Sequence, residues 1–352
     1  MNTNDILKVL IRHKSISSNL KSCTLVLAKA QKILSASGVD SKVIKSCDKP
    51  VLIWGQTDLE NTHWLINSHL DVVPGEIDQF KPVIVKDKLF GRGSADTKSS
   101  CAILLSNAAN WINIATHKDI TFMLCVDEEI GGASTKELLK DFKNIQGSIF
   151  LEPTGEQMII KAKGIMQIQI IAKGIAAHGS KPWLGQSALE KIISGLSSFK
   201  EAFPTPQKET RDTTFNFSIL RSGDTINQIP NTAELWCDVR WNPQDDPNTI
   251  VHTIRDTFHD CEVNIIKQES AIKSDLGSLL TKSFVSALKH NSLNPISGFE
   301  HGSSDARHVS ALNIPAIVFG PRGGNLHTRG EWVSQRSLAR VTRVLDHWLK
   351  NI

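Results

Sequence analysis

The chain contains no tyrosine, which excludes this residue from any catalytic role. Its six cysteines include no Cys-x-x-Cys pair, and most of them lie within apolar runs. This distribution is typical of reduced, buried thiols and not of a disulfide framework. The sequence also lacks an apolar run of transmembrane length, and residues 1–5 lack the basic and apolar pattern of a signal peptide. We therefore expect a cytoplasmic protein without a membrane partner.

A strong excess of either charge is missing as well. Forty basic residues stand against 36 acidic ones, which gives a formal net charge of +4 that is spread over the chain. A balance this mild does not indicate a nucleic-acid partner. With 352 residues, the chain is long enough for two domains that each bury a core.

The most informative stretch is an apolar run at residues 65–71, which contains His69 and Asp71. The two residues are two positions apart, so a strand places their side chains on the same side. A carboxylate beside an imidazole is the usual beginning of a metal site, because it fixes the ring tautomer and raises the basicity of the ligand nitrogen. Taken alone the pair is weak support, since His-x-Asp occurs often by chance.

Further candidate ligands follow strand-like runs, four of them at the end of the run and His327 after an intervening glycine-rich loop. They are Asp96, Glu128, Glu129, Glu152 and His327, after the runs at 89–95, 120–126, 148–151 and 314–320. Together with residues 65–71, these runs predict five strand ends on one rim of an open α/β sheet. The alternation of strands and helices favours a mostly parallel central sheet with helices on both faces.

The chemistry of this set indicates metal-assisted hydrolysis. Two imidazoles with three carboxylates suit zinc, or cobalt and manganese, better than calcium or magnesium. A shared carboxylate allows two metals about 3.5 Å apart. Glu128, next to the candidate ligand Glu129, is then free to act as general base. A structural zinc site is the weaker alternative, because such sites tend to be rich in cysteine and no cysteine stands in this set.

Six motifs, taken together, resemble one protein family. They are SHLDVVP at 68–74, GRGSADTK at 91–98, DEE at 127–129, EPT at 152–154, AHGSKP at 177–182 and His327. In this order they are similar to the co-catalytic di-zinc amidohydrolases, which include succinyl-diaminopimelate desuccinylase, acetylornithine deacetylase, aminoacylase and glutamate carboxypeptidase. The resemblance covers nearly the whole chain and implies a zinc-peptidase-like fold.

The resemblance also implies a role for each candidate residue. His69 and Glu152 would bind one zinc, Glu129 and His327 the other, and Asp96 would bridge them. Asp71 would be the hydrogen-bonding partner of His69. A hydroxide that bridges the two zinc ions would attack the scissile carbonyl, while Glu128 carries its proton to the leaving nitrogen.

The order of strands and helices changes near residue 163. From there the pattern predicts strand, helix, strand, strand, helix and strand, the ferredoxin-like order. We therefore expect a catalytic domain at 1–162 and 275–352, interrupted by an inserted α+β domain at 163–274. By resemblance, the insert forms a homodimer and also acts as a lid.

Four residues of the insert and the following loop are substrate-binding candidates by resemblance, and a fifth is catalytic. The four are Asn227, Arg240, Gly302 and Ser303. His178 would reach the active site of the partner subunit and hold the oxyanion, which suits an imidazole donor. Arg240 would recognise the substrate carboxylate, although a surface salt bridge to Asp238 is an open alternative.

The motifs leave the substrate open. Desuccinylases typically carry an arginine pair before the glycine that matches Gly164, and an asparagine four residues before the last ligand. Here Ala162, Lys163 and Gly323 stand at these positions, and Arg322 brings a charge close to His327. The expected function is deacylation of a small N-acyl amino acid, with a di-zinc carboxypeptidase or dipeptidase as the alternative. A metal-dependent binding protein without catalysis is a further alternative, but the chain has lost neither the base nor a ligand.

Overall fold

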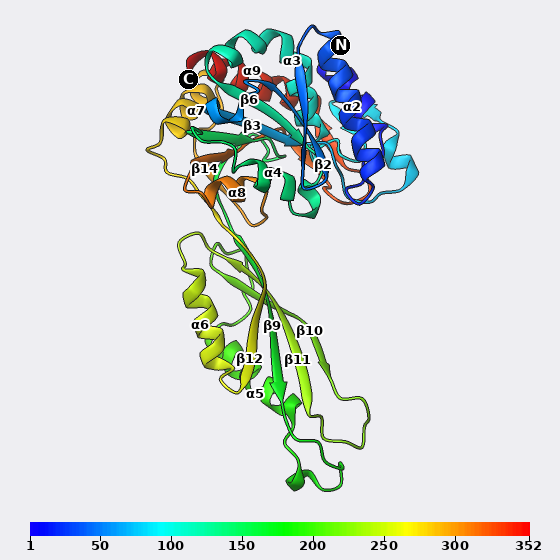
Figure 1. The fold of residues 1–352 in the computed structure, drawn as a ribbon, viewed down its shortest axis with the longest axis vertical. Coiled ribbons are helices and arrows are strands. Elements are labelled where there is room, and N and C mark those ends of the chain that lie inside the picture. The colour runs from blue at the N-terminus through cyan, green and yellow to red at the C-terminus, as the bar shows by residue number, and fades with distance from the viewer. The chain divides into compact units, whose positions relative to one another are not determined.

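The computed structural model of the chain describes residues 1–352, which divide into two units (Figure 1). The first unit comprises residues 1–161, 273–299 and 304–352, and the second comprises residues 162–272 and 300–303. The sequence places 300–303 in the catalytic domain, whereas the structure groups this segment, with Gly302 and Ser303, in the second unit. The reason is a contact with the start of the second unit, because the Lys163 N–H donates to the Glu300 carbonyl at 3.1 Å.

A nine-stranded sheet forms the centre of the first unit, in the order β1-β2-β6-β3-β7-β15-β8-β13, with β14 paired to β8. The strands are β1 (Ser41–Ser46), β2 (Lys49–Gly55), β3 (Trp64–His69), β6 (Ile120–Cys125), β7 (Gly147–Phe150), β8 (Met158–Ala162), β13 (Ile272–Lys273), β14 (Ser297–Glu300) and β15 (Ala316–Val318). The central strands β6, β3, β7 and β15 are parallel, and antiparallel β2 and β8 flank them. The predicted parallel sheet is thus confirmed for its centre, where the strands carry the site.

Helices cover both faces of this sheet (Figure 1). One layer contains α1 (Thr3–Ile11), α2 (Leu20–Ala36), α3 (Lys98–His117), α7 (Leu279–His290) and α9 (Gln335–Asn351), and the other contains α4 (Ala133–Leu138) and α8 (Ala306–Ser310). In β3, Trp64 and Ile66 join the core under the first layer, while buried Leu65 points to the other face. A strand buried on both faces is continuously apolar, which is why residues 64–66 show no polar alternation.

Polar caps fix where three of these helices begin. Asn19, Ser278 and Ser334 each accept a hydrogen bond from the backbone N–H three residues further on. Such caps satisfy N–H groups that have no partner within the helix. None of the helices is long and apolar enough to cross a membrane.

A second, four-stranded sheet of the first unit is fully antiparallel, in the order β16-β17-β5-β4. Its strands are β4 (Val83–Val85), β5 (Lys88–Phe90), β16 (Gly323–Gly324) and β17 (Trp332–Ser334). The strand-like run before Asp96 therefore lies outside the central sheet. Short 3-10 helices complete the chain at Leu59–Asn61, Ile77–Phe80, Glu128–Ile130 and Pro182–Leu184.

The second unit has the predicted ferredoxin-like order. It comprises β9 (Gly164–Lys173), α5 (Ala188–Ala202), β10 (Thr214–Ser222), β11 (Thr232–Trp241), α6 (Pro247–Thr257) and β12 (Cys261–Glu269). The sheet order is β10-β11-β9-β12, and all neighbours are antiparallel. Met166, Ile168 and Ile170 alternate into the core of this unit, as period two requires.

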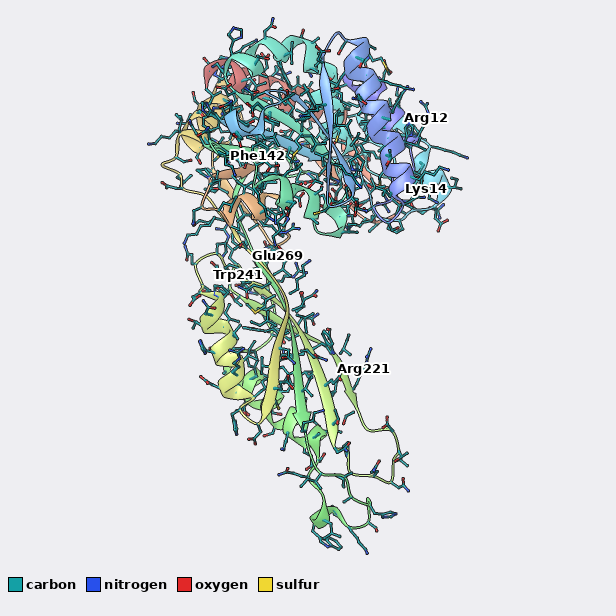
Figure 2. All side chains as sticks on the ribbon, viewed as in Figure 1. Arg12, Lys14, Phe142, Arg221, Trp241 and Glu269 are labelled. Atoms are coloured by element: carbon teal, nitrogen blue, oxygen red, sulfur yellow. The ribbon has the colours of Figure 1, made fainter.

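Close packing at the first residue of β9 requires a glycine. A Cβ on Gly164 would lie 2.0 Å from Cε2 of Trp241, which pairs with it from the end of β11 (Figure 2). The change of pattern near residue 163 thus coincides with a position at which only glycine leaves room for the indole ring.

Candidate metal centre

Three parallel central strands deliver candidate ligands at their carboxyl ends. His69 is the last residue of β3, Glu128 and Glu129 lie in the 3-10 turn after β6, and Glu152 follows β7. Because β6, β3 and β7 are adjacent and parallel, their ends meet at one edge of the sheet. The sequence prediction for these side chains relied on the same rule.

The other two candidate ligands come from the small antiparallel sheet. Asp96 lies in the loop between β5 and α3, and His327 lies in the loop between β16 and β17. The expectation of five strand ends on one sheet is therefore wrong for the run before Asp96. The run at 314–320 does contain β15 of the central sheet, but β16 of the small sheet separates it from His327. The reason is that pairing between β5 and β17, which are more than two hundred residues apart, builds a separate sheet beside the central one.

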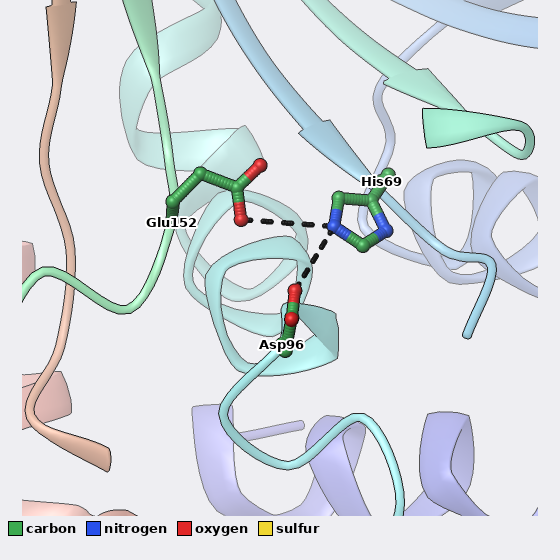
Figure 3. A group of neighbouring side chains, drawn as sticks. All are labelled: His69, Asp96 and Glu152. Carbon is green, nitrogen blue, oxygen red and sulfur yellow. Dashed lines mark ion pairs between the residues drawn. The ribbon is translucent and has the colours of Figure 1, made fainter. Parts of the chain in front are cut away.

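The five side chains form two groups that share Asp96. In the first, His69 Nε2 lies 3.3 Å from Asp96 Oδ1 and 3.6 Å from Glu152 Oε2 (Figure 3). In the second, His327 Nε2 lies 3.0 Å from Asp96 Oδ2 and 3.2 Å from Glu129 Oε2. Within each group the ligand atoms lie within 4.8 Å of one another. One Asp96 oxygen faces each group, which is the arrangement of a bridging carboxylate.

The electrostatics of these groups fit a bound cation. His69 Nε2 and Glu129 Oε1 are buried without a hydrogen-bond partner. Burial raises the pKa of Glu152 to about 7, against the opposing charge of His69. Burial and the charge of Asp96 also raise the pKa of Glu129 to about 7. Carboxylates crowded out of water in this way gain most from a positive ion, and this nitrogen and oxygen donor set suits zinc and related metals.

Asp71 holds the other nitrogen of His69. Its Oδ1 lies 3.3 Å from His69 Nδ1, and its Oδ2 accepts hydrogen bonds from Ser17 Oγ at 2.8 Å and from the Glu129 N–H at 3.2 Å. Burial alone would lower the pKa of His69, but the charge of Glu152 and hydrogen bonds that include Asp71 raise it well above its usual value. Asp71 thus orients an imidazole and a neighbouring acidic turn at once. No motif or spacing in the sequence indicated Ser17.

Glu128 lies at the edge of the first group. Its Oε2 is 4.0 Å from His69 Nε2, and its Oε1 is 3.9 Å from Arg307 Nη1. Burial raises its pKa well above the usual value, although His69 opposes this shift. A carboxyl group that lies beside the candidate ligands without belonging to either group is in the position that a general base requires.

Comparison with known proteins identifies the family. The family model described as Peptidase family M20/M25/M40 matches residues 65–351. The chain belongs to this family. It is a hydrolase of the class that acts on amide or peptide bonds.

The M20 chain has similar relatives of several activities. A [LysW]-lysine/[LysW]-ornithine hydrolase from Sulfurisphaera tokodaii is 26% identical over 277 residues, which cover 77% of this chain and 75% of the relative. A tripeptidase structure from Staphylococcus aureus has a TM-score of 0.80 at 20% identity and covers 99% of this chain and 97% of its own. A Bacillus subtilis protein described as a dinuclear metal binding peptidase has a TM-score of 0.74 at 12% identity, covering 99% and 96%. The structural similarities show that the fold is shared.

Residues that the sequence analysis did not assign support the Glu128 turn of the M20 chain. Arg307 Nη2 donates to the Gly131 carbonyl at 2.8 Å, and Asp305 lies fully buried with its Oδ1 3.7 Å from the same nitrogen. His308 Nε2 lies 3.1 Å from the Gly131 carbonyl and 3.5 Å from Asp305 Oδ1. The three residues lie at the start of α8, close to one another in the sequence but far from the Glu128 turn that they contact. The one available signal was that Asp305, Arg307 and His308 stand close together in the sequence.

Two expected residues of the second unit lie side by side. His178 and Gln228 form an isolated antiparallel β-bridge, and the Gly179 N–H donates to the Asn227 carbonyl at 2.7 Å. The His178 ring is exposed, and its Nδ1 accepts a hydrogen bond from the Ser180 N–H at 3.2 Å. In a neutral ring this bond places the proton on Nε2, which then points a donor outward.

Arg240 and His301 have partners within the second unit. Arg240 Nε donates to Asp238 Oδ2 at 2.8 Å, the salt bridge that the sequence left open. His301 Nε2 lies 3.0 Å from Glu209 Oε1. The substrate role of Arg240, like those of Asn227, Gly302 and Ser303, stays a prediction.

Proposed function

We propose that this M20 hydrolase binds two divalent metal ions, with zinc as the preferred metal, and cleaves the amide bond of a small N-acyl amino acid. The observation that carries the proposal is the pair of ligand groups that share Asp96. Two half-sites with one common carboxylate are the arrangement that a co-catalytic pair of metals needs. His69 and Glu152 would hold one ion, and Glu129 and His327 the other.

When bound, the metal pair would lower the pKa of water and polarise the scissile carbonyl. Glu128 lies beside the first group without belonging to either group, so its carboxylate would be free to take a proton from water and to donate it to the leaving nitrogen. Asp71 keeps the His69 ring in the tautomer that presents Nε2 to the metal. Loss of Glu128 should therefore impair proton transfer, whereas loss of Asp71 should impair metal binding.

The second unit would supply the remaining groups. We infer that the chain forms a homodimer through this unit and that His178 donates its Nε2–H to the oxyanion of the partner's substrate. The backbone hydrogen bond from Ser180 supports this role, because it fixes the required tautomer. Arg240 would bind the substrate carboxylate after giving up its partly buried salt bridge with Asp238.

The similarity to a [LysW]-lysine/[LysW]-ornithine hydrolase favours an N-acyl amino acid over a peptide. We propose release of a free amino acid from an acyl group, with the cytoplasm as the location. The acyl group is left to the experiment, because neither the succinyl-binding arginine pair nor the matching asparagine is present.

Metal content and substrate preference test the proposal together. Protein purified without chelator is expected to contain two metal ions per chain and to hydrolyse an N-acyl member of a panel of N-acetyl amino acids, N-succinyl amino acids, dipeptides and tripeptides. A chelator should abolish turnover, and added zinc or cobalt should restore it. A preference for dipeptides or tripeptides would replace the acyl substrate by a peptide. Metal-free protein that turns over the panel would overturn the metal mechanism.

A further inference from the structure

A buried carboxylate outside the ligand groups connects the two loops of the small sheet. Glu331 is 1% exposed and belongs to neither ligand group. Its Oε2 accepts hydrogen bonds from Arg92 Nη1 at 2.8 Å and from the Gly93 N–H at 3.0 Å. Its Oε1 accepts hydrogen bonds from the Ala95 N–H at 2.9 Å and from the Asp96 N–H at 3.1 Å. Every donor lies in the loop that carries the shared ligand Asp96.

The position of Glu331 follows from the pairing of the small sheet. Phe90 of β5 pairs with Trp332 of β17, so Glu331 and Gly91 lie one step beyond the last pair. The Gly91 N–H still donates to the Glu331 carbonyl at 3.0 Å. From this point one loop continues to Asp96 and the other leads back to His327. The two loops diverge where the strand pairing ends, and the carboxylate of Glu331 links them by hydrogen bonds.

Arg92 also contacts the SHLDVVP motif at residues 68–74. Its guanidinium forms a buried ion pair with Glu331, and its Nη2 also donates to the Pro74 carbonyl at 3.3 Å. A buried carboxylate is costly unless charged or polar donors satisfy it. Here four donors do so, and three of them are backbone N–H groups of the Asp96 loop. Their geometry fixes the backbone of Asp96 itself and not only the surrounding fold.

We propose that Glu331 is a positioning residue for both metal half-sites. The proposal rests on the proposed function, because it assumes that Asp96 bridges two ions. Since the N–H of Asp96 is held by Glu331, and each Asp96 oxygen faces one ligand group, a shift of this backbone displaces a ligand of both groups. Removal of the Glu331 charge should therefore weaken the binding of both ions together, although Glu331 itself belongs to neither ligand group.

Glu331→Gln is the sharpest substitution. It keeps the size of the side chain but replaces one oxygen by an amide NH₂, which cannot accept the two N–H groups that this oxygen receives. Glu156→Gln is the matched control. Glu156 is also buried, at 7% exposure, and accepts hydrogen bonds from Arg340 Nε at 2.9 Å and Nη2 at 2.6 Å. Its partner belongs to α9 and not to a loop that carries a ligand.

The experiment is a cobalt titration of metal-free protein, followed by the visible absorption of bound Co²⁺ and by calorimetry. Both variants should lose stability in urea. Glu331→Gln should bind both ions about 10- to 100-fold more weakly, the usual effect of losing a group that orients a ligand, while Glu156→Gln should keep wild-type affinity. Glu331→Asp, which keeps the charge but withdraws the oxygens, should fold and show a smaller loss at both ions.

The outcomes separate the two proposals. Wild-type protein that does not bind two metal ions refutes the proposed function, whatever the variants do. Wild-type protein that binds two ions, together with a Glu331→Gln or Glu331→Asp variant of unchanged affinity, shows that Glu331 stabilises the fold only. Weakening of a single ion would overturn the argument from the shared Asp96. Equal weakening in Glu156→Gln would show a general effect of lost stability.

Discussion

Gly132, at the beginning of α4, is the position where a single methyl group should do most damage to the site. Its φ of 60° is in the left-handed region, and a Cβ would lie 1.7 Å from Oδ1 of buried Asp305. Gly155 offers the matched comparison, because its φ is 66° and nothing lies within 4 Å of its Cβ position. Gly155→Ala therefore measures the backbone strain alone, about 1–2 kcal/mol.

Gly132→Ala adds the collision to this strain. To make room, Asp305 must leave the position where it faces Arg307 and His308, and breaking such a buried pair costs about 3–5 kcal/mol. The expected total of about 4–7 kcal/mol is comparable to the whole stability of many domains, about 5–15 kcal/mol. Because Arg307 and His308 also contact the Gly131 carbonyl, the variant should displace the Glu128 turn.

Urea unfolding of the metal-free proteins tests this prediction. Gly132→Ala should unfold at much lower urea than Gly155→Ala, or fail to accumulate in folded form. In a double-mutant cycle, Asp305→Ala should cost less in the Gly132→Ala background than in wild type, since it removes the atom that collides. Equal stability of the two alanine variants, or additivity in the cycle, would refute the steric argument.

The remaining predictions concern the proposed chemistry. Glu128→Ala should bind both metals with near wild-type affinity and lose several orders of magnitude in kcat; retained turnover would remove Glu128 from the mechanism. Asp71→Asn should reduce metal affinity about 10- to 100-fold in a cobalt titration, because it no longer accepts all the donors around it, and unchanged affinity would contradict its role beside His69. Removal of metal by a chelator should lower Tm, with recovery on adding zinc, since an ion that binds only the folded state stabilises it. His178→Ala should lower kcat but keep metal binding. If His178 acts across a symmetric dimer, mixing this variant with Glu128→Ala subunits should restore up to about a quarter of wild-type turnover. No recovery after verified subunit exchange would place His178 in the site of its own subunit.

The ferredoxin-like order of the second unit could be predicted because it depends on local patterns. Met166, Ile168 and Ile170 alternate along β9, and each helix shows a periodic apolar face between turn residues. The same holds for the central strands, whose ends place His69, Glu129 and Glu152. Strand direction then brings the three together, because parallel neighbours end at the same edge.

The sequence by itself thus determined the fold class, through strand periodicity, and the candidate ligands, through the polar residues at strand ends. The tertiary structure decided how the ligands are held. Asp96 and His327 meet because β5 pairs with β17, a non-local pairing that no local pattern encodes. Glu331 satisfies the Asp96 loop for the same reason, and Arg307 reaches the Glu128 turn across a similar separation along the chain. Hydrogen bonds and ion pairs between distant segments depend on the final register of the sheets, and this register exists only in the folded chain.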